Sequence, residues 1–448
     1  MALAAGLPRP LLAGQDAFKR SHDEVARLLK PLLETSDPAL FDFAVSVYEH
    51  AIFGRMQPAE PPIKHPWLIP GGPYVGQWVW DTTFLTDLVA ILPGQDEFIR
   101  GIYQNYWDAQ GRLDTVKPAY RRGMVPNFIA PDSGPPGFTG KDWETFPGFS
   151  QAPLICWGVE RVYRRTHDLE LVRAALPHLE EFHDWYWRER DVTGAGLVTV
   201  GSYDGVAQHA RFETYDNEVD LDTLQMTPHP GRPAGAENGP WYGDICIPAN
   251  TGYLLLSEQR MIELAEAVGD HALAARRKPI LKKGIAAMRR HMWDEEAGCF
   301  LAVRRGTMEK IRPATVGGMV PVQGPAVTNK QAARMAQALM TKDWATPLPI
   351  PSVVRSAEAY RSDGFWRGDV WPTTVFQTVM GLARHGQRAL AGEIAGKLID
   401  NAMKVGVSER YDSQTGAPLG VRNLGMSSII LTIALEGVSP RHKIRVRD

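Results

Sequence analysis

Amphipathic segments with the spacing of a helix recur along the whole chain. In the segment 252–268, apolar residues spaced by seven, four and three positions lie at Leu254, Met261, Ala265 and Val268. This spacing places them on one side of a helix. A Gly-Asp pair at 269–270 ends the segment, and the next helical pattern begins almost at once. Short turns of this kind between long helices are typical of antiparallel helical hairpins.

The same analysis predicts about eleven or twelve helices and few strands. The helices are expected near 15–34, 38–54, 78–92, 95–107, 150–166, 168–189, 248–268, 270–292, 328–340, 370–385, 387–403 and 423–436. Short strand-like runs lie at 196–202 and 299–305 and near Ile311. No repeat of 20–50 residues is evident, which argues against a solenoid. The pattern predicts a mainly α fold with small β accessories.

Three stretches between the helices are rich in Pro and Gly and also contain aromatic residues, at 65–76, 121–149 and 226–244. Loops of this length inside a compact domain are usually functional. Domain junctions are the alternative, but no change of composition separates the flanking helices. We therefore expect one catalytic domain over 1–448, with the loops 121–149 and 226–244 near its site.

Composition narrows the class of protein. The chain has 448 residues, with 49 Lys and Arg against 51 Asp and Glu, and no basic block. This balance argues against nucleic acid or an anionic membrane as the main partner. No run of 18 apolar residues predicts a transmembrane helix. The N-terminus lacks the positive charge of a secretory signal, and prolines interrupt its apolar run. The expected location is cytoplasmic.

The cysteines point to the same compartment. Cys156, Cys246 and Cys299 are odd in number and far apart, which fits neither a disulfide framework nor a Cys-rich metal site. Three buried thiols in a reducing compartment are expected. Whether the chain forms a homo-oligomer is a question that the sequence leaves open.

The stretch 72–84, GPYVGQWVWDTTF, combines aromatic rings with one carboxylate. Trp78 and Trp80 precede Asp81 at the start of a predicted helix. A sugar presents apolar C–H faces and hydroxyl edges, so its site needs flat aromatic surface beside hydrogen-bond acceptors. The alternative is that Asp81 is an ordinary helix N-cap.

The stretch 211–223, RFETYDNEVDLDT, contains five acids within ten positions, at Glu213, Asp216, Glu218, Asp220 and Asp222. Crowded carboxylates raise one another's pKa, and an acid protonated at neutral pH can act as a general acid. A calcium loop would need Gly and Glu where Leu221 and Thr227 stand. A solvated acidic loop remains an alternative.

Two further stretches lie late in the chain. GFWRGDVWPTTVFQ, at 364–377, offers Trp366, Arg367, Asp369 and Trp371 before a helix that begins near a proline. Its alternative interpretation is aromatic packing under a loop, with an Arg–Asp pair at the surface. SERYDSQTGAPLG, at 408–420, places Glu409 after a helix and beside a turn, where a surface glutamate is the default.

Through the order of these stretches, the chain resembles glycoside hydrolase family 63. This family includes processing α-glucosidases and bacterial hydrolases of mannosylglycerate and glucosylglycerate. The resemblance extends from about Tyr74 to Ser428. Further matching stretches are GMVPN (123–127), SQAP (150–153), 183–198, 292–300 and 328–339. The WxWD and WRGxVWP motifs also occur in related helical-toroid glycosidases such as trehalases. The resemblance implies an (α/α)6 toroid of two rings of six helices, which agrees with the helix count.

The resemblance also implies an inverting α-glycosidase, with Asp216 as the general acid and Glu409 as the general base. Inversion requires two carboxylates about 6.5–9.5 Å apart on opposite faces of the sugar. It needs no metal and no organic cofactor. The substrate-binding residues expected from the matching stretches are Tyr74, Gln77, Trp78, Trp80, Asp81, Gln151, Glu213, Trp366, Arg367 and Trp371.

Departures from the family pattern bear on the identity of the substrate. Phe365 stands where relatives often have Tyr, Asp369 stands where they often have Pro, and the segment 426–428 replaces one that contains Trp. The expected substrate is a small α-linked glucoside or mannoside, with glucosylglycerate and mannosylglycerate as candidates. A trehalase-like or kojibiose-type α-glucosidase, a sugar epimerase or isomerase, and a carbohydrate-binding protein are the alternatives.

An acidic aglycone would need an arginine to receive its carboxylate. Arg121, Arg122 and Arg211, all in predicted loops, are the candidates.

Overall fold

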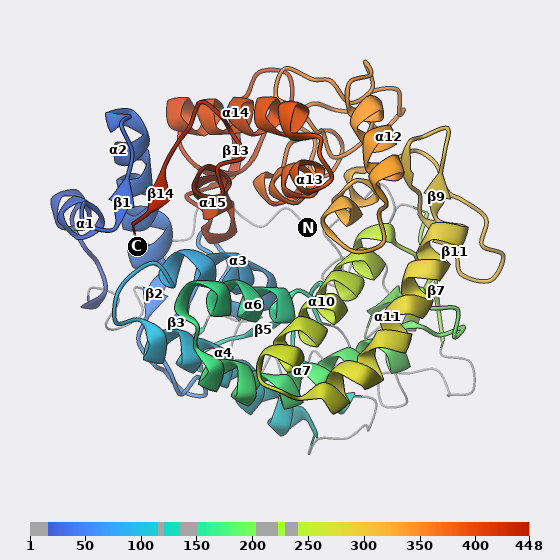
Figure 1. Ribbon diagram of the computed structural model, residues 1–448, viewed down its shortest axis with the longest axis horizontal. Coiled ribbons are helices and arrows are strands. Elements are labelled where there is room, and N and C mark those ends of the chain that lie inside the picture. Colours follow the sequence, from blue (N-terminus) through green and yellow to red (C-terminus); the bar gives the residue numbers. More distant parts are fainter. Residues whose placement is uncertain (1–16, 115–120, 135–149, 203–222, 229–240, 448) are drawn as a thin grey trace.

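The computed structural model describes residues 17–114, 121–134, 150–202, 223–228 and 241–447. In this part of the chain two concentric rings of helices surround a common axis, as Figure 1 shows. The architecture is the expected (α/α)6 toroid.

The inner ring contains five helices and one irregular segment, each in contact with the next. The helices are α3 (Val79–Val89), α6 (Ile155–Thr166), α10 (Pro248–Ala267), α13 (Pro372–Arg384) and α15 (Ile429–Leu435). Between α10 and α13, the short 3-10 turns η6 (Val316–Gly318) and η7 (Val320–Gln323) occupy the sixth place. Every residue of α3 is buried, as expected for a helix enclosed on all sides.

The outer ring consists of helices that each present one apolar face to the inner ring. They are α2 (Pro38–Val47), α4 (Asp96–Asp114), α7 (Leu169–Arg190), α11 (His271–His291), α12 (Asn329–Leu339) and α14 (Arg388–Val405), and α1 (His22–Leu29) packs on α2. Each predicted helical segment thus contains a helix. Four of these helices are shorter than expected. Helix α1 starts at His22, and α2 ends at Val47 and continues as a single π-helical turn, η2 (Tyr48–Ile52). Helix α6 starts only at Ile155, and α15 starts only at Ile429, after the 3-10 turn η8 (Gly425–Ser428).

Polar residues in the short turns explain where the outer helices begin. Asp168 accepts hydrogen bonds from the backbone N–H groups of Glu170 and Leu171 at the start of α7. Asp270 does the same for Leu273 in α11. These side chains satisfy N–H groups that have no partner within the first turn of a helix.

The strands are short and lie at the helix junctions. The largest sheet has the antiparallel order β11 (Val303–Arg304), β8 (Trp241–Cys246), β6 (Thr199–Ser202), and β7 (Met226–Thr227) also pairs with β8. Two-stranded sheets join β4 (Gln77–Trp78) to β5 (Phe128–Ile129) and β12 (Ser408–Tyr411) to β13 (Pro418–Arg422). The remaining pairs are β1 (Leu33–Glu34) with β14 (Arg445–Val446), β2 (Met56–Gln57) with β3 (Trp67–Leu68), and β9 (Trp293–Asp294) with β10 (Cys299–Phe300).

The strand predictions are only partly confirmed. The runs 196–202 and 299–305 contain β6, β10 and β11. The expected strand near Ile311 is wrong, because this part of the described chain contributes only isolated bridges, from Lys310 to Val303 and from Thr315 to Val353. The strands β8 and β12 were not expected at all.

The inner helices run in the same direction, so that all their N-terminal ends lie at one end of the ring and all their C-terminal ends at the other. The two ends of the ring carry different side chains. At their N-terminal ends, the ring of Trp80 on α3 meets the ring of Tyr253 on α10 at 5.7 Å. At their C-terminal ends, Arg161 on α6 binds Asp87 on α3 at 2.8 Å and Glu436 after α15 at 2.6 Å. Burial raises the pKa of Asp87, but the arginines outweigh it and lower that pKa to about 2. The positive ends of five helix dipoles therefore meet at one end of the ring.

All three cysteines lie in the described part of the chain, where they are buried and form no disulfide. Among the described residues, no helix combines the length and the apolar character needed to cross a membrane.

Candidate active site

Helix α3 begins with the aromatic residues of the first motif. Trp78 is the N-cap of α3, and its ring stacks on Phe128 at 4.8 Å with an interplanar angle of 19°. Tyr74 meets the ring of Trp78 edge-on at 5.8 Å. The pairing of β4 with β5 sets Trp78 opposite Phe128. Asp81 directly follows Trp80 in the first turn of α3, where it is buried.

The start of α3 is joined to three other inner segments through Trp80. Its backbone N–H donates to Oε1 of Gln151 at 2.7 Å, just before α6. Its indole N–H donates to Sδ of Met426 at 3.1 Å, just before α15. The ring lies against Tyr253, whose hydroxyl donates to Gln377 on α13 at 2.9 Å. Residues from five parts of the chain therefore meet at the N-terminal end of the ring.

Glu409 lies on strand β12 and is only 5% exposed. The hydroxyl of Tyr74 donates to its Oε1 at 3.2 Å, and the backbone N–H of Val421 on β13 donates to its Oε2 at 2.9 Å. Gly420 has φ +70°, and a Cβ at this position would collide with the carboxylate. The default interpretation as a surface glutamate is therefore wrong, and both oxygens of Glu409 are oriented by the protein.

The WRGDVWP turn forms a stacked tryptophan pair before α13. The rings of Trp366 and Trp371 are 4.3 Å apart with an interplanar angle of 9°, and both are buried. Trp366 has a left-handed backbone with φ +54°, which a bulky residue rarely adopts. Gly368 has φ +146°, and a Cβ there would approach the carbonyl oxygen of Arg361 to 2.6 Å. Backbone packing therefore requires glycine at this position.

The sequence suggested, as an alternative, an Arg–Asp pair at the surface of this turn. The structure does not show such a pair among the described residues of the turn. Asp369 is completely buried rather than at the surface. Its ion partner is Arg410 on β12, at 3.2 Å. Arg367 is half-buried beside the tryptophan pair. Burial raises the pKa of Asp369 to about 7, against the opposing effect of Arg410.

Gln77 does not share the environment of its neighbour Trp78. Successive residues of a strand point to opposite sides, and the buried amide of Gln77 points toward α4. Its Nε2 donates to the carbonyl oxygen of Ile102 at 2.8 Å, and its Oε1 accepts from Asn105 at 3.1 Å. The substrate contact expected for Gln77 has no support in these bonds, because both ends of its amide bind protein groups.

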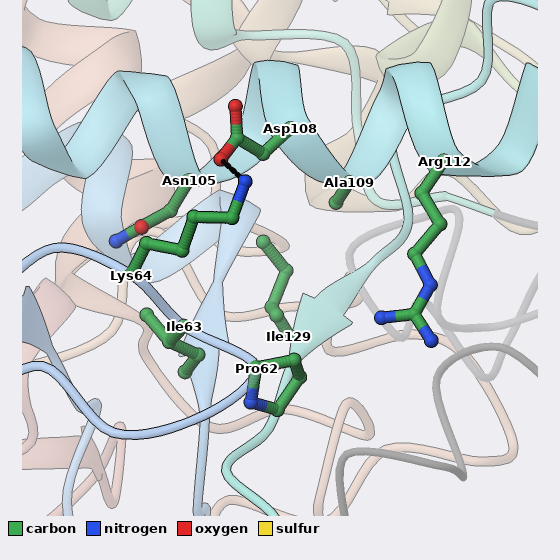
Figure 2. A pocket seen from close by; sticks show the side chains of 8 residues that line it. All are labelled: Pro62, Ile63, Lys64, Asn105, Asp108, Ala109, Arg112 and Ile129. Atoms are coloured by element: carbon green, nitrogen blue, oxygen red, sulfur yellow. Dashed lines mark hydrogen bonds and ion pairs between the residues drawn. The ribbon is translucent and has the colours of Figure 1, made fainter.

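Asn105 also lines a pocket of about 210 Å³ on this side of α4, which Figure 2 shows. There Lys64 and Asp108 are paired at 2.7 Å. None of the predicted site residues lines this pocket.

The second motif, except for its last residue Thr223, lies outside the described residues. This applies to Glu213, to Asp216 and to Arg211. On either side of the segment, Ser202 and Met226 pair with Trp241 and Gly243 of the same strand, β8. Strand β8 leads directly into α10 at the N-terminal end of the inner ring.

The structure adds residues that the sequence reasoning missed. Phe128 supplies the surface on which Trp78 stacks, Met426 accepts from Trp80, and Arg410 binds Asp369. Two signals were present in the sequence, since Met426 lies in a segment that departs from the family pattern and Arg410 directly follows Glu409. In the described ranges, no group of three or more His, Cys, Asp or Glu residues is placed to hold a metal ion.

Comparison with known proteins shows the family and the fold of this chain. A profile of the mannosylglycerate hydrolase MGH1-like glycoside hydrolase domain matches residues 74–427. The mannosylglycerate hydrolase of Rubrobacter radiotolerans is 22% identical over an alignment of 425 residues. The match covers 81% of this chain and 92% of the relative.

Two solved structures share the fold. The GH63 mannosylglycerate hydrolase of Thermus thermophilus in complex with Tris has a TM-score of 0.66 and 18% identity, and the match covers 87% of this chain and 98% of that one. The neutral trehalase of Saccharomyces cerevisiae has a TM-score of 0.58 and 12% identity, with coverages of 90% and 80%.

Proposed function

This chain belongs to the mannosylglycerate hydrolase MGH1-like glycoside hydrolase family, and we propose that it hydrolyses a small α-linked glucoside or mannoside with Glu409 as general base. It is a glycosidase, and its substrate is a carbohydrate. The observation that carries the proposal is the buried carboxylate of Glu409, held by Tyr74 and Val421 beside an aromatic group at one end of the ring.

The proposed reaction is a single displacement with inversion. Glu409 takes a proton from a water molecule whose oxygen attacks the anomeric carbon. The bond from that carbon to the leaving oxygen breaks, and Asp216 supplies the proton that the leaving oxygen takes up. The role of Asp216 rests on the match of its stretch to the family.

The proposed subsite for the cleaved sugar consists of the groups around the start of α3. Asp81 would accept hydrogen bonds from sugar hydroxyls, and the amide N–H of Gln151 would donate, because its oxygen is already bound to Trp80. Aromatic rings bind the C–H faces of a sugar. Tyr74, Trp78, Trp80, Trp366 and Trp371 supply such rings, with Glu213 and Arg367 as further polar contacts.

The proposed aglycone is acidic, as in α-mannosylglycerate or α-glucosylglycerate. The N-terminal ends of five inner helices meet at this end of the ring, and their partial positive charge favours a carboxylate there. Among the candidate arginines, Arg121 is buried and Arg122 is exposed. Arg121 is therefore the better candidate of these two, and Arg211 lies outside the described residues.

Hydrolysis of α-mannosylglycerate, α-glucosylglycerate, trehalose and kojibiose would test these proposals, with NMR detection of the first anomer released. We expect faster turnover of an acidic substrate and release of the β-anomer. Preference for trehalose or kojibiose would refute the acidic aglycone and favour a trehalase-like or kojibiose-type enzyme. A rearranged sugar would instead indicate an epimerase or isomerase.

Substitution of the two carboxylates tests the mechanism. Glu409→Gln and Asp216→Asn should each reduce kcat by at least about 1,000-fold without unfolding the protein. Glu436→Gln is the control, because it removes a carboxylate from the opposite end of the ring. Near-normal kcat in Glu409→Gln would refute its role as base.

A further inference from the structure

We propose that Asp369 is a positioning residue that holds the strand of Glu409 and the Trp366–Trp371 pair in one unit through Arg410. The proposal rests on the role of Glu409 proposed above. The hydrogen bonds of Asp369 within the described chain go to residues other than Glu409. Its effect on the reaction would therefore pass through the backbone of β12 and through the turn before α13.

The carboxylate of Asp369 joins three segments of the chain. Its Oδ1 accepts from the backbone N–H of Trp366 at 3.1 Å and from Oγ of Ser352 at 2.7 Å. Its Oδ2 accepts from Nη1 of Arg410 at 3.2 Å. Ser352 in turn accepts from the backbone N–H of Gly368 at 2.8 Å. These partners are all donors, and a carboxylate is the acceptor that satisfies them.

Arg410 directly follows Glu409 on β12, where an irregularity between Ser408 and Arg410 shifts the register with β13. Its guanidinium carbon lies 5.2 Å from the centre of the Phe365 ring, and its Nη1 also donates to the carbonyl oxygen of Asp363 at 2.9 Å. Arg410 therefore anchors the residue of β12 that is next to the proposed base.

The backbone joins the same two segments. Val370 and Tyr411 exchange hydrogen bonds of 2.8 and 2.9 Å between the turn and β12. Asp369 and Arg410 directly precede these residues, so that their ion pair extends the backbone link. The bond from Trp366 to Asp369 also helps to hold the left-handed backbone of Trp366, which is a conformation that needs support from its surroundings.

Asp369→Asn tests the proposal with little change of shape. The amide can accept from Trp366 and Ser352, but its NH2 group then faces Arg410, which is also a donor. We expect kcat to fall about 10- to 100-fold, since an error of about 1 Å in the position of a catalytic group can cost about 100-fold in rate, and KM to change less than about threefold. Asp294→Asn is a matched control, because Asp294 is a buried carboxylate with two cationic partners, Lys310 and Arg312.

A kcat within about twofold of the wild type for folded Asp369→Asn would overturn the proposal. If this variant does not fold, Arg410→Gln and Arg410→Lys decide the matter. A large loss of kcat in Arg410→Gln with partial recovery in Arg410→Lys supports the proposal, and kcat within about twofold of the wild type in Arg410→Gln overturns it. Glu409→Gln is measured in parallel, because an active Glu409→Gln refutes the proposed function, whereas an inactive one with normal Asp369→Asn refutes only the positioning role.

Discussion

The hydroxyl of Tyr74 offers the most direct test of how the protein orients Glu409. Tyr74→Phe removes one oxygen and keeps the ring that meets Trp78 edge-on. The lost interaction is the hydrogen bond to Oε1 of Glu409, and the bond from Val421 to Oε2 remains. The variant therefore leaves the carboxylate in place but removes the tyrosine bond that orients one of its two oxygens.

The geometry sets the expected size of the effect. A hydrogen bond to a charged group contributes about 1.5–3 kcal/mol, and short O–H···O⁻ contacts of about 2.5–2.7 Å are the strong ones. The bond from Tyr74 is longer, at 3.2 Å, and Tyr74 is half-buried. We therefore expect a loss of about 1–1.5 kcal/mol in the transition state, which corresponds to a fall of roughly 5- to 12-fold in kcat/KM.

Steady-state kinetics on the preferred glycoside would measure this loss, with thermal unfolding of the same samples. Tyr103→Phe is the matched control, because the hydroxyl of Tyr103 forms a buried hydrogen bond of 3.1 Å with Thr86 in the middle of α3. We expect that control to lower stability with little effect on kcat/KM. Wild-type kcat/KM in Tyr74→Phe, combined with an inactive Glu409→Gln, would refute the reasoning that the hydroxyl orients the base.

Two further predictions concern buried carboxylates. Asp87→Asn removes the buried partner that Arg161 and Arg165 share and leaves them the partly exposed Glu436. We expect the free energy of unfolding in urea to fall by about 3–5 kcal/mol with kcat unchanged; a change below about 1 kcal/mol would contradict this. Asp369 has a folded-state pKa of about 7 against an ordinary 3.8, so the folded protein binds more protons than the unfolded chain between these values. The Asp369 carboxyl therefore makes its full contribution to the free energy of unfolding below about pH 4. As the pH rises to about 7, the free energy of unfolding falls by up to about 4 kcal/mol. Urea unfolding at several pH values should show this decline in the wild type and a flatter profile in Asp369→Asn, and parallel profiles would refute it.

The helices could be predicted from the sequence because their signals are local. Apolar spacing over three or more turns, Asp caps such as Asp168 and Asp270, and glycine-containing turns each act within a few residues. The motif at 78–81 was identifiable for the same reason. The toroid itself was implied by the resemblance to the family, and the number of helices agreed with it.

Most of the short strands could not be predicted in this way. Strand β12 has four residues, too few for an alternating pattern to stand out, and it exists because β13 pairs with it. Glu409 therefore looked like a surface residue after a helix. Gln77 stands beside Trp78 in the sequence and shares its motif, but the pleat of β4 turns its amide toward Asn105 on α4.

The sequence by itself determined the helices, their hairpin order and the residue types available for sugar chemistry, because these depend on neighbours within a few positions. Only the tertiary structure decided which of those residues meet. Tyr74 binds a carboxylate 335 positions away, and Arg410 binds an aspartate 41 positions away. Such partners are selected when the ring of helices closes and buried polar groups must find donors and acceptors within reach, a condition that depends on the packing of the whole ring.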